Sequence, residues 1–203
     1  MISDIDYAAI MQHAPTDRVD DIGVYLSRIM EDIWCDAYRD MCERPTGILG
    51  FDWSGFHYWF DYVSQLQEDE LPQTDELIED RIVVVYGFSH PEEVVKRDTS
   101  RQRGFPLTIR RGDGTVKYDK GHFLGHTLGG GLDANLFPQR RDVNRGWSER
   151  GKVFRSMERY CQEHPGTFCF SRPIYDDQSW HPAVLEYGLL REDGTLWVEQ
   201  FEN

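Results

Sequence analysis

Residues 118–131 read YDKGHFLGHTLGGG, and NLFPQ at 135–139 and DVNRGW at 142–147 follow closely behind. The first five residues are typical of a strand that ends at His122, and a glycine-rich loop comes next. Asn144 then stands where a helix opens. A histidine at a strand end and an asparagine at a helix start bring an imidazole and an amide oxygen to one place. The sequence therefore predicts a chemical site in this segment.

Strand patterns surround this segment. Residues 82–86 read IVVVY, a β-branched run that predicts a strand. Two further pairs of strand-like runs flank glycine-containing turns and predict hairpins, one joining 107–111 to 115–118 and the other joining 183–190 to 196–201. Helical spacing runs from residue 143 to 161. We expect an α+β fold with an antiparallel sheet.

The first part of the chain is predicted to be helical. From residue 17 to 43, apolar residues recur at intervals of three and four, which predicts an amphipathic helix with one buried face. The aromatic-rich stretch 53–66 predicts a second helix, whose rings lie in a core or an interface. Residues 67–75 are polar and acidic and indicate a connection. We therefore divide the chain into an acidic helical N-terminal region, residues 1–74, and a second domain, residues 75–203.

Charge is distributed unevenly along the chain. The protein carries 22 Lys and Arg against 36 Asp and Glu, a net charge of −14. The net charge is −16 for residues 1–95, +8 for residues 96–160 and −6 for residues 161–203. Overall acidity argues against a nucleic-acid binder, because phosphate contacts dominate that affinity. The basic block nevertheless predicts a local site for a polyanion.

Composition argues against several other classes. The longest apolar run has about five residues, whereas a membrane span needs roughly 20. The first residues lack the basic-then-apolar pattern of a secretory signal, so we expect a cytoplasmic protein or one delivered by a specialised secretion system. Four cysteines without a Cys-x-x-Cys pair argue against a disulfide scaffold and against a zinc knuckle.

The order of the motifs resembles the DNA/RNA non-specific endonuclease family of the ββα-metal (His-Me finger) nucleases. The signature of that family is Asp-Arg-Gly-His, then Asn-Leu-x-Pro-Gln, then Asn-x-Gly-x-Trp on a helix. The resemblance covers roughly residues 80–203 and is densest from Asp119 to Trp147. It implies a ββα-metal nuclease core within the α+β fold. Lys120 departs from the pattern, since it keeps the charge of the usual arginine but loses the bidentate fork.

The resemblance implies the central roles for His122 and Asn144. His122 would be the general base, because an imidazole accepts a proton near neutral pH. Asn144 would be the single direct protein ligand of a divalent cation, plausibly Mg²⁺, which keeps several waters and needs few protein oxygens. His126 lies four residues after His122, but that spacing on a strand and loop does not place both rings on one helical face, so zinc is not expected.

Two carboxylates would support this pair. Family members carry a glutamate farther along the helix, which orients water bound to the metal. Glu158 matches best if a few residues are inserted after Trp147, and Glu149 is the alternative. Asp119 matches the first residue of the signature and would order the strand that carries His122.

Basic residues would complete the site. Family members place an arginine from an earlier segment against the charge of the transition state. Arg103 is the first choice here, and Arg101 and Arg97 are the alternatives. Phosphate contacts are expected from four residues close to the signature, namely Lys120, Arg140, Arg141 and Arg145.

The implied function is a metal-dependent endonuclease that hydrolyses DNA or RNA with little sequence specificity. Similar domains serve as scavenging nucleases, toxins delivered between bacteria and defence effectors, and the missing signal pattern favours a toxin or effector. The acidic region would screen the basic cleft, bind an inhibitor or partner protein, or simply pack behind the nuclease. The rival interpretation is a non-catalytic binding protein, either a nuclease-like scaffold or an acidic immunity or nucleic-acid-mimic protein. Acidity supports the rival, whereas His122 and Asn144 oppose it.

Overall fold

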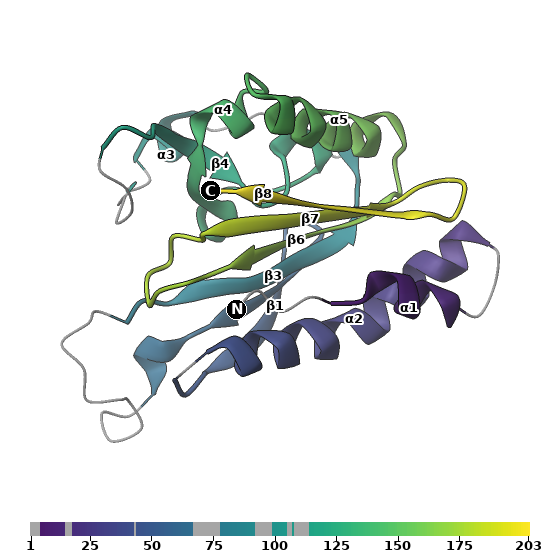
Figure 1. Cartoon of the computed structure of the whole chain (residues 1–203), viewed down its shortest axis with the longest axis horizontal. Coiled ribbons are helices and arrows are strands. Elements are labelled where there is room, and N and C mark those ends of the chain that lie inside the picture. The colour runs from purple at the N-terminus through teal and green to yellow at the C-terminus, as the bar shows by residue number, and fades with distance from the viewer. Residues whose placement is uncertain are drawn as a thin grey trace.

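A six-stranded antiparallel sheet forms the middle layer of an α+β protein (Figure 1). The computed structural model describes residues 5–14, 18–42, 44–66, 78–91, 99–104, 107 and 114–203. The strands follow the spatial order β1 (Ile48–Trp53), β2 (Phe56–Asp61), β3 (Arg81–Phe88), β6 (Phe168–Ile174), β7 (Val184–Leu190) and β8 (Leu196–Glu202).

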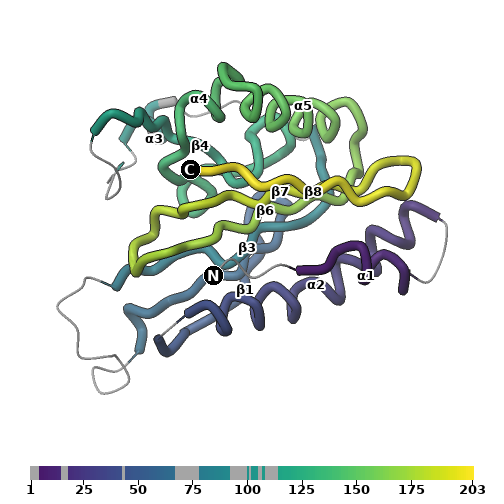
Figure 2. Tube along the Cα trace, in the orientation of Figure 1, coloured from purple at the N-terminus to yellow at the C-terminus, as the bar shows by residue number. Residues whose placement is uncertain are grey.

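Two other layers cover the faces of the sheet. The first contains the helices α1 (Tyr7–Gln12) and α2 (Val19–Met41). The second contains the two-stranded ladder of β4 (Tyr118–His122) and β5 (Leu136–Arg140), with α4 (Arg141–Asn144) and α5 (Glu149–Glu163). A short helix, α3 (Thr99–Gly104), precedes β4. The Cα trace in Figure 2 shows these two layers on opposite sides of the sheet.

Helix α2 confirms the predicted amphipathic helix, with ends two residues inside the predicted ones. Its inner side chains are spaced by three and four residues and include the fully buried Leu26 and Trp34. Asp20 and Asp21 lie in its first turn, where carboxylates favour the helix dipole. The buried face packs on β3 and β6, so this helix covers one face of the sheet.

The predicted helix over residues 53–66 is wrong. The chain instead forms the hairpin of β1 and β2, followed by a short 3₁₀ turn, η1 (Val63–Gln65). Ser54 and Gly55 form the turn with φ values of 49° and 75°, a conformation that tight hairpins require. Phe56 and Tyr58 then point to the same face of the sheet and are buried in its core. The aromatic residues therefore follow the two-residue period of a strand.

Two predicted strand patterns are confirmed by the structure. Strand β3 and the hairpin of β7 and β8 confirm the patterns at 82–86 and at 183–201. The helical pattern at 143–161 is divided between α4 and α5, because the chain turns at Gly146 with φ of 68°. Strand β6 was not anticipated. The hairpin predicted around residue 113 falls mostly outside the described residues.

The sheet crosses the predicted boundary between residues 74 and 75. Strand β2 belongs to the N-terminal region and pairs with β3 over Phe56–Asp61. Helix α2 covers apolar residues of β3 and β6, including Val83 and Phe170. Removal of the first 74 residues would therefore expose both a sheet edge and a sheet face. No helix in the described ranges is long and apolar enough to cross a membrane.

A buried ion pair and its hydrogen bonds tie the end of α2 to the end of β2. The Arg44 guanidinium lies 2.9 Å from the Asp61 carboxylate, and both side chains are fully buried. Asp61 also accepts hydrogen bonds from the Tyr38 hydroxyl at 2.6 Å and from the Gly47 amide at 2.7 Å. The Tyr38 hydroxyl in turn accepts from Arg81 at 2.8 Å. Loss of the Asp61 charge would leave buried guanidinium groups without their counterion.

We expect Asp61→Asn to lower the free energy of unfolding by about 3 kcal/mol, because it breaks a buried ion pair. Urea unfolding at pH 7 measures the change. Asp40→Asn, on the exposed face of α2, is the matched control and should change stability by less than about 0.5 kcal/mol. Equal stability of Asp61→Asn and wild type would contradict the proposed contribution of this network.

Candidate functional site

The candidate site is built on the ladder of β4 and β5. His122 is the last residue of β4 and lies opposite Leu136, the first residue of β5. His122 is only 8% exposed. Phe123 and Phe137 stack at 4.4 Å between their ring centroids and anchor the ladder in the core. The end of the ladder therefore fixes the histidine from two sides.

Gly121 has a definite packing reason to precede the histidine. A Cβ atom at this position would lie 2.3 Å from Oε1 of Gln139 and 2.4 Å from its Cβ. Gln139 is 1% exposed and lies on the opposite strand. Any larger residue would displace this side chain or separate the strands, so the glycine of the motif is required by the ladder itself.

Asn135 holds the loop that follows His122. Its side chain donates to the carbonyl oxygens of Leu124 at 2.8 Å and Gly131 at 2.9 Å, and it accepts from the Leu124 amide at 3.0 Å. The residue is fully buried. One amide side chain thus closes the loop around two short 3₁₀ turns, η3 (His126–Leu128) and η4 (Asp133–Asn135). Asn135 belongs to the Asn-Leu-x-Pro-Gln motif, but the motif alone predicts no function for its side chain.

The N-terminal hairpin reaches the same loop through His90, which the sequence analysis missed. The His90 amide donates to the Leu128 carbonyl at 2.9 Å. Its ring nitrogens lie 2.9 Å from the Phe88 carbonyl and 3.0 Å from the Ser54 carbonyl, at the tip of the β1–β2 turn. The His90 ring therefore lies between the end of β3 and the β1–β2 turn. The turn signal at Ser54-Gly55 was the available clue to this contact.

Asn144 and Glu158 approach the ladder from two helices. Asn144 ends α4, which packs against β4 and β5, and its side chain is half-buried. It makes no hydrogen bond within the described part of the chain. Glu158 lies on the inner face of α5, and its Oε1 would be 2.7 Å from a Cβ added to Gly125. Its carboxylate therefore lies against the loop that follows His122.

The alternative glutamate occupies a different environment. The Glu149 side chain is 88% exposed in the first turn of α5, where it pairs with Lys152. Glu158 is mostly buried and pairs with Arg155 on the same helix. The two candidates thus differ in burial and in their distance from the loop.

Asp119 sits between two arginines. Its carboxylate accepts from Nε of Arg141 at 2.9 Å and from Nε of Arg145 at 2.6 Å. Burial alone raises the pKa of Asp119, but hydrogen bonds and charge from Arg145 and Arg141 outweigh it and lower the pKa below its usual value. The carboxylate fastens α4 to β4. The three groups together retain one net positive charge.

The remaining cations also have partners within the protein. Lys120 Nζ donates to the carbonyls of Gln102 and Arg103, and so holds the end of α3 against β4. Arg140 pairs with Asp142 at 3.1 Å. The structure thus places α3, and with it Arg103, beside the ladder, and the residue is exposed. The side chains of the alternatives Arg101 and Arg97 lie outside the described residues.

The donor set suits a hard cation held by few protein ligands. Within the described ranges there is no group of three or more His, Cys, Asp or Glu side chains arranged to hold a metal ion. His126 directs Nδ1 toward the Gly130 carbonyl at 3.3 Å. The amide oxygen of Asn144 and the carboxylate of Glu158 are oxygen donors of the kind that Mg²⁺ prefers. The residues present therefore fit the cation that the sequence analysis expected.

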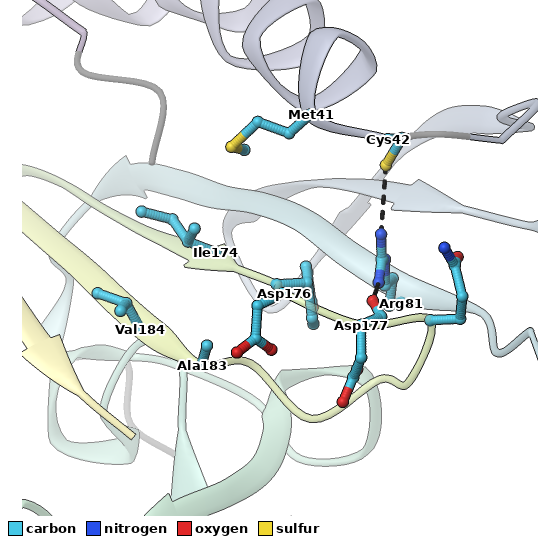
Figure 3. A pocket seen from close by; sticks show the side chains of 10 residues that line it. Met41, Cys42, Arg81, Ile174, Asp176, Asp177, Ala183 and Val184 are labelled. Atoms are coloured by element: carbon cyan, nitrogen blue, oxygen red, sulfur yellow. Dashed lines mark hydrogen bonds between the residues drawn. The ribbon is translucent and has the colours of Figure 1, made fainter. Parts of the chain in front are cut away.

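A separate cavity of about 440 Å³ lies at the end of α2 and is shown in Figure 3. Arg81 stands at its wall and donates to Cys42 Sγ at 3.2 Å and to the Asp177 carbonyl at 2.7 Å. None of its lining residues comes from β4, β5 or α5. It is therefore distinct from the candidate site.

No protein-family model matches the chain, and no curated protein matches it significantly. Arguments about function consequently depend on the geometry of the site.

We expect Asn135→Ala to lower the free energy of unfolding by about 2–3 kcal/mol, because it leaves buried backbone groups of the loop unpaired. Asn144→Ala is the matched control, since it removes the same side chain where no hydrogen bond is lost, and should cost less than about 0.5 kcal/mol. Urea unfolding of both variants measures the contrast. Similar losses in the two variants would be inconsistent with the loop-holding role of Asn135.

Asp119→Asn should destabilise the protein in a pH-dependent manner. The folded-state pKa lies below the usual value, so the carboxylate stabilises the fold above about pH 4 and the effect is lost as pH falls through that folded-state pKa. At pH 7 the cost is expected to be about 1–2 kcal/mol. Unfolding curves at pH 7, 5, 4 and 3 should show the gap to wild type closing at acid pH, whereas the exposed control Asp32→Asn shows no gap. A gap independent of pH would assign the loss to packing.

Proposed function

We propose that the protein is a metal-dependent endonuclease that hydrolyses phosphodiester bonds of DNA or RNA with little sequence specificity. The main support is a continuous strand–strand–helix unit. Strand β4 ends at His122 and pairs with β5. Helix α4 follows β5 directly, ends at Asn144 and packs on β4. This strand–strand–helix order supports a ββα-metal core. It is the arrangement that the resemblance to the DNA/RNA non-specific endonucleases implies.

His122 acts as the general base in the proposed reaction. It accepts a proton from a water molecule, whose oxygen attacks the phosphorus while the bond to the 3′ oxygen breaks. The ladder, the Phe123–Phe137 stack and the Asn135 contacts hold the strand end at His122 and the loop that follows it in place. Such positioning matters because proton transfer requires the base within hydrogen-bond reach of the water.

Asn144 and Glu158 are the proposed holders of a divalent cation, most plausibly Mg²⁺. Asn144 would bind it directly and Glu158 through water. When bound, the cation stabilises negative charge on the phosphoryl oxygens and on the leaving oxygen. Asn144 lies on α4, which packs on β4 and β5, and Glu158 lies on α5, which packs on α4 and on η3, so the packing of these elements sets where both residues lie relative to the ladder.

Positive charge near the ladder supports binding of a phosphate backbone. Arg141 and Arg145 share one carboxylate, and their side chains remain 38% and 47% exposed. Asp119 thus holds two guanidinium groups at the ladder, and the three groups keep one net positive charge. Arg103, on α3 beside β4, is the proposed group that faces the transition-state charge. Contacts of this kind bind phosphates independently of sequence.

The biological setting proposed is that of a toxin or defence effector, acting in the cytoplasm or after delivery by a specialised secretion system. A nuclease in such a setting needs restraint, and the proposed restraint is an inhibitor or partner protein at the N-terminal region. Exposed aspartates on the outer face of α2, among them Asp32, Asp36 and Asp40, give that region its acidity. Helix α2, which carries them, and the ladder, which carries His122, lie on opposite sides of the sheet (Figure 1).

Cleavage of plasmid DNA and of structured RNA with Mg²⁺ or EDTA tests the proposal. His122→Ala and Asn144→Ala should each lower the cleavage rate by roughly 10²–10⁴-fold, because each removes a group needed in the transition state. Glu158→Gln should reduce the rate strongly, and Glu149→Gln, the same change on the exposed face of α5, should leave it unaltered.

Thermal unfolding of each variant controls for loss of fold. Cleavage that persists in EDTA, or in His122→Ala, would refute the assigned mechanism. Absence of cleavage by folded wild-type protein with Mg²⁺, Mn²⁺, Ca²⁺ and Zn²⁺ would favour the non-catalytic binding protein instead.

A further inference from the structure

An aromatic pocket of about 290 Å³ lies beside the ladder, between the sheet and the loop that precedes β5. Phe60, Tyr62, Tyr175 and Trp180 contribute half-buried rings to its wall. Phe123 closes it toward the ladder. Its apolar lining contrasts with the polar surface around it, and its volume is close to the lower end of small-molecule sites, about 300 Å³, so it suits a single ring system.

The pocket adjoins the candidate catalytic residue directly. Phe123 follows His122 in the chain, and Leu136, another wall residue, lies opposite His122 in the ladder. The pocket therefore lies beside the end of the ladder that carries His122. This proximity links whatever occupies the pocket to the substrate of the site.

Two carboxylates define the chemistry of the polar side. Asp80 and Asp133 line the pocket together with Arg81. The Asp80 carboxylate accepts one hydrogen bond on each oxygen, from the Ser64 amide at 2.8 Å and from the Ser64 hydroxyl at 2.6 Å, and each oxygen has a second acceptor position. Arg81 is already engaged by hydrogen bonds to Tyr38, Cys42 and two backbone carbonyls, and its guanidinium stacks on Tyr175 at 4.2 Å. Carboxylates accept hydrogen bonds and repel phosphate. The pocket therefore favours a flat ring that carries N–H donors and disfavours a phosphate group.

Asp133 is held at the pocket by an unusual backbone. It has a φ of 57°, in the left-handed region that non-glycine residues seldom adopt. The neighbouring Asn135 fixes the same segment through its contacts with Leu124 and Gly131. The loop thus presents a carboxylate to the pocket and supports the histidine with the same residues.

We propose that the aromatic pocket binds one unpaired, amino-bearing nucleobase of the substrate strand, stacked on its rings with the amino group facing Asp80 and Asp133. A base can leave the duplex only where it is unpaired or flipped. The proposal rests on the nuclease function above and adds a substrate class to it: nucleic acid with single-stranded segments containing cytosine, adenine or guanine.

Binding in EDTA tests the pocket without cleavage. Calorimetric titration of the full chain with d(C)₆ and d(U)₆ compares pyrimidines that differ at C4, amino against keto. We expect d(C)₆ to bind more tightly than d(U)₆. Ala134→Trp, which fills the pocket, should weaken d(C)₆ binding roughly 5- to 150-fold, the loss of one base–aromatic stack. Leu49→Trp, on the exposed edge of β1, is the matched control and should bind as wild type does.

Tyr62→Ala provides a second variant in case Ala134→Trp fails to fold. It removes a half-buried wall ring and should weaken d(C)₆ binding by a similar factor while retaining the unfolding midpoint within a few degrees. Equal affinity of wild type for d(C)₆ and d(U)₆, or unchanged affinity in both pocket variants, would overturn the proposal. Free cytidine that binds as tightly as d(C)₆ would identify a nucleoside site and refute a substrate subsite.

The cleavage assay separates this proposal from the nuclease function. If wild type binds d(C)₆ in the pocket but cuts no substrate, hydrolysis fails and base binding stands. If it cuts DNA and the pocket variants bind and cut as wild type does, base binding fails and hydrolysis stands.

Discussion

Burial of both faces of β3 is the constraint on which the other layers depend. Six successive residues of this strand, from Arg81 to Tyr86, are buried. Val83 and Tyr86 contact the core under α2, whereas Ile82 and Val85 contact the core under the ladder and α5. Such a strand is stable only when apolar layers cover it on both sides. The N-terminal helix and the candidate site are thus two covers of one sheet.

The position of His122 follows from that arrangement. A two-stranded ladder is marginal on its own, so β4 and β5 need support from outside. The stacked rings of Phe123 and Phe137 enter the sheet core, and the terminal Asn203 side chain bonds to the Arg140 amide and the Pro138 carbonyl, both at 2.8 Å. His90 connects the N-terminal hairpin to this region, because its amide bonds to Leu128 and its ring lies 3.0 Å from the Ser54 carbonyl. Residues from nearly the whole length of the chain therefore hold the ladder and the loop beside His122.

Sequence patterns predicted the elements whose periodicity matches their burial. Helix α2 and strand β3 each have a single buried pattern, and the Asp193-Gly194 turn marks the last hairpin. The aromatic stretch after residue 53 misled the prediction because nearly every residue is large, so no period stands out. The turn at Ser54-Gly55 contained the correct signal, and its weight was underestimated.

The sequence predicted which residue types form the candidate site and their order in the chain, but not which residues they contact. The motif correctly located His122 at a strand end, but Asn144, predicted at the start of a helix, is the last residue of the short helix α4, because the chain turns at Gly146 before α5 begins. Three sets of contacts depend on distances across the fold. They are the pairing of Asp119 with both Arg141 and Arg145, the contact of Lys120 with the end of α3, and the contacts of His90. Linear spacing does not contain these distances, because each joins segments 17 or more residues apart.

Spatial separation of charge explains how an acidic chain can present a cationic surface. The aspartates of α2 lie one sheet and one helix layer away from the ladder, and each layer adds about 10 Å. The Debye length at physiological ionic strength is about 8 Å, so their field is largely screened at His122. Nearby carboxylates such as Asp119 and Asp133 affect the electrostatic potential at the ladder far more than the net charge of −14 does. Restraint of the site by the acidic region would therefore require direct contact through a partner protein, since its field alone decays across the sheet.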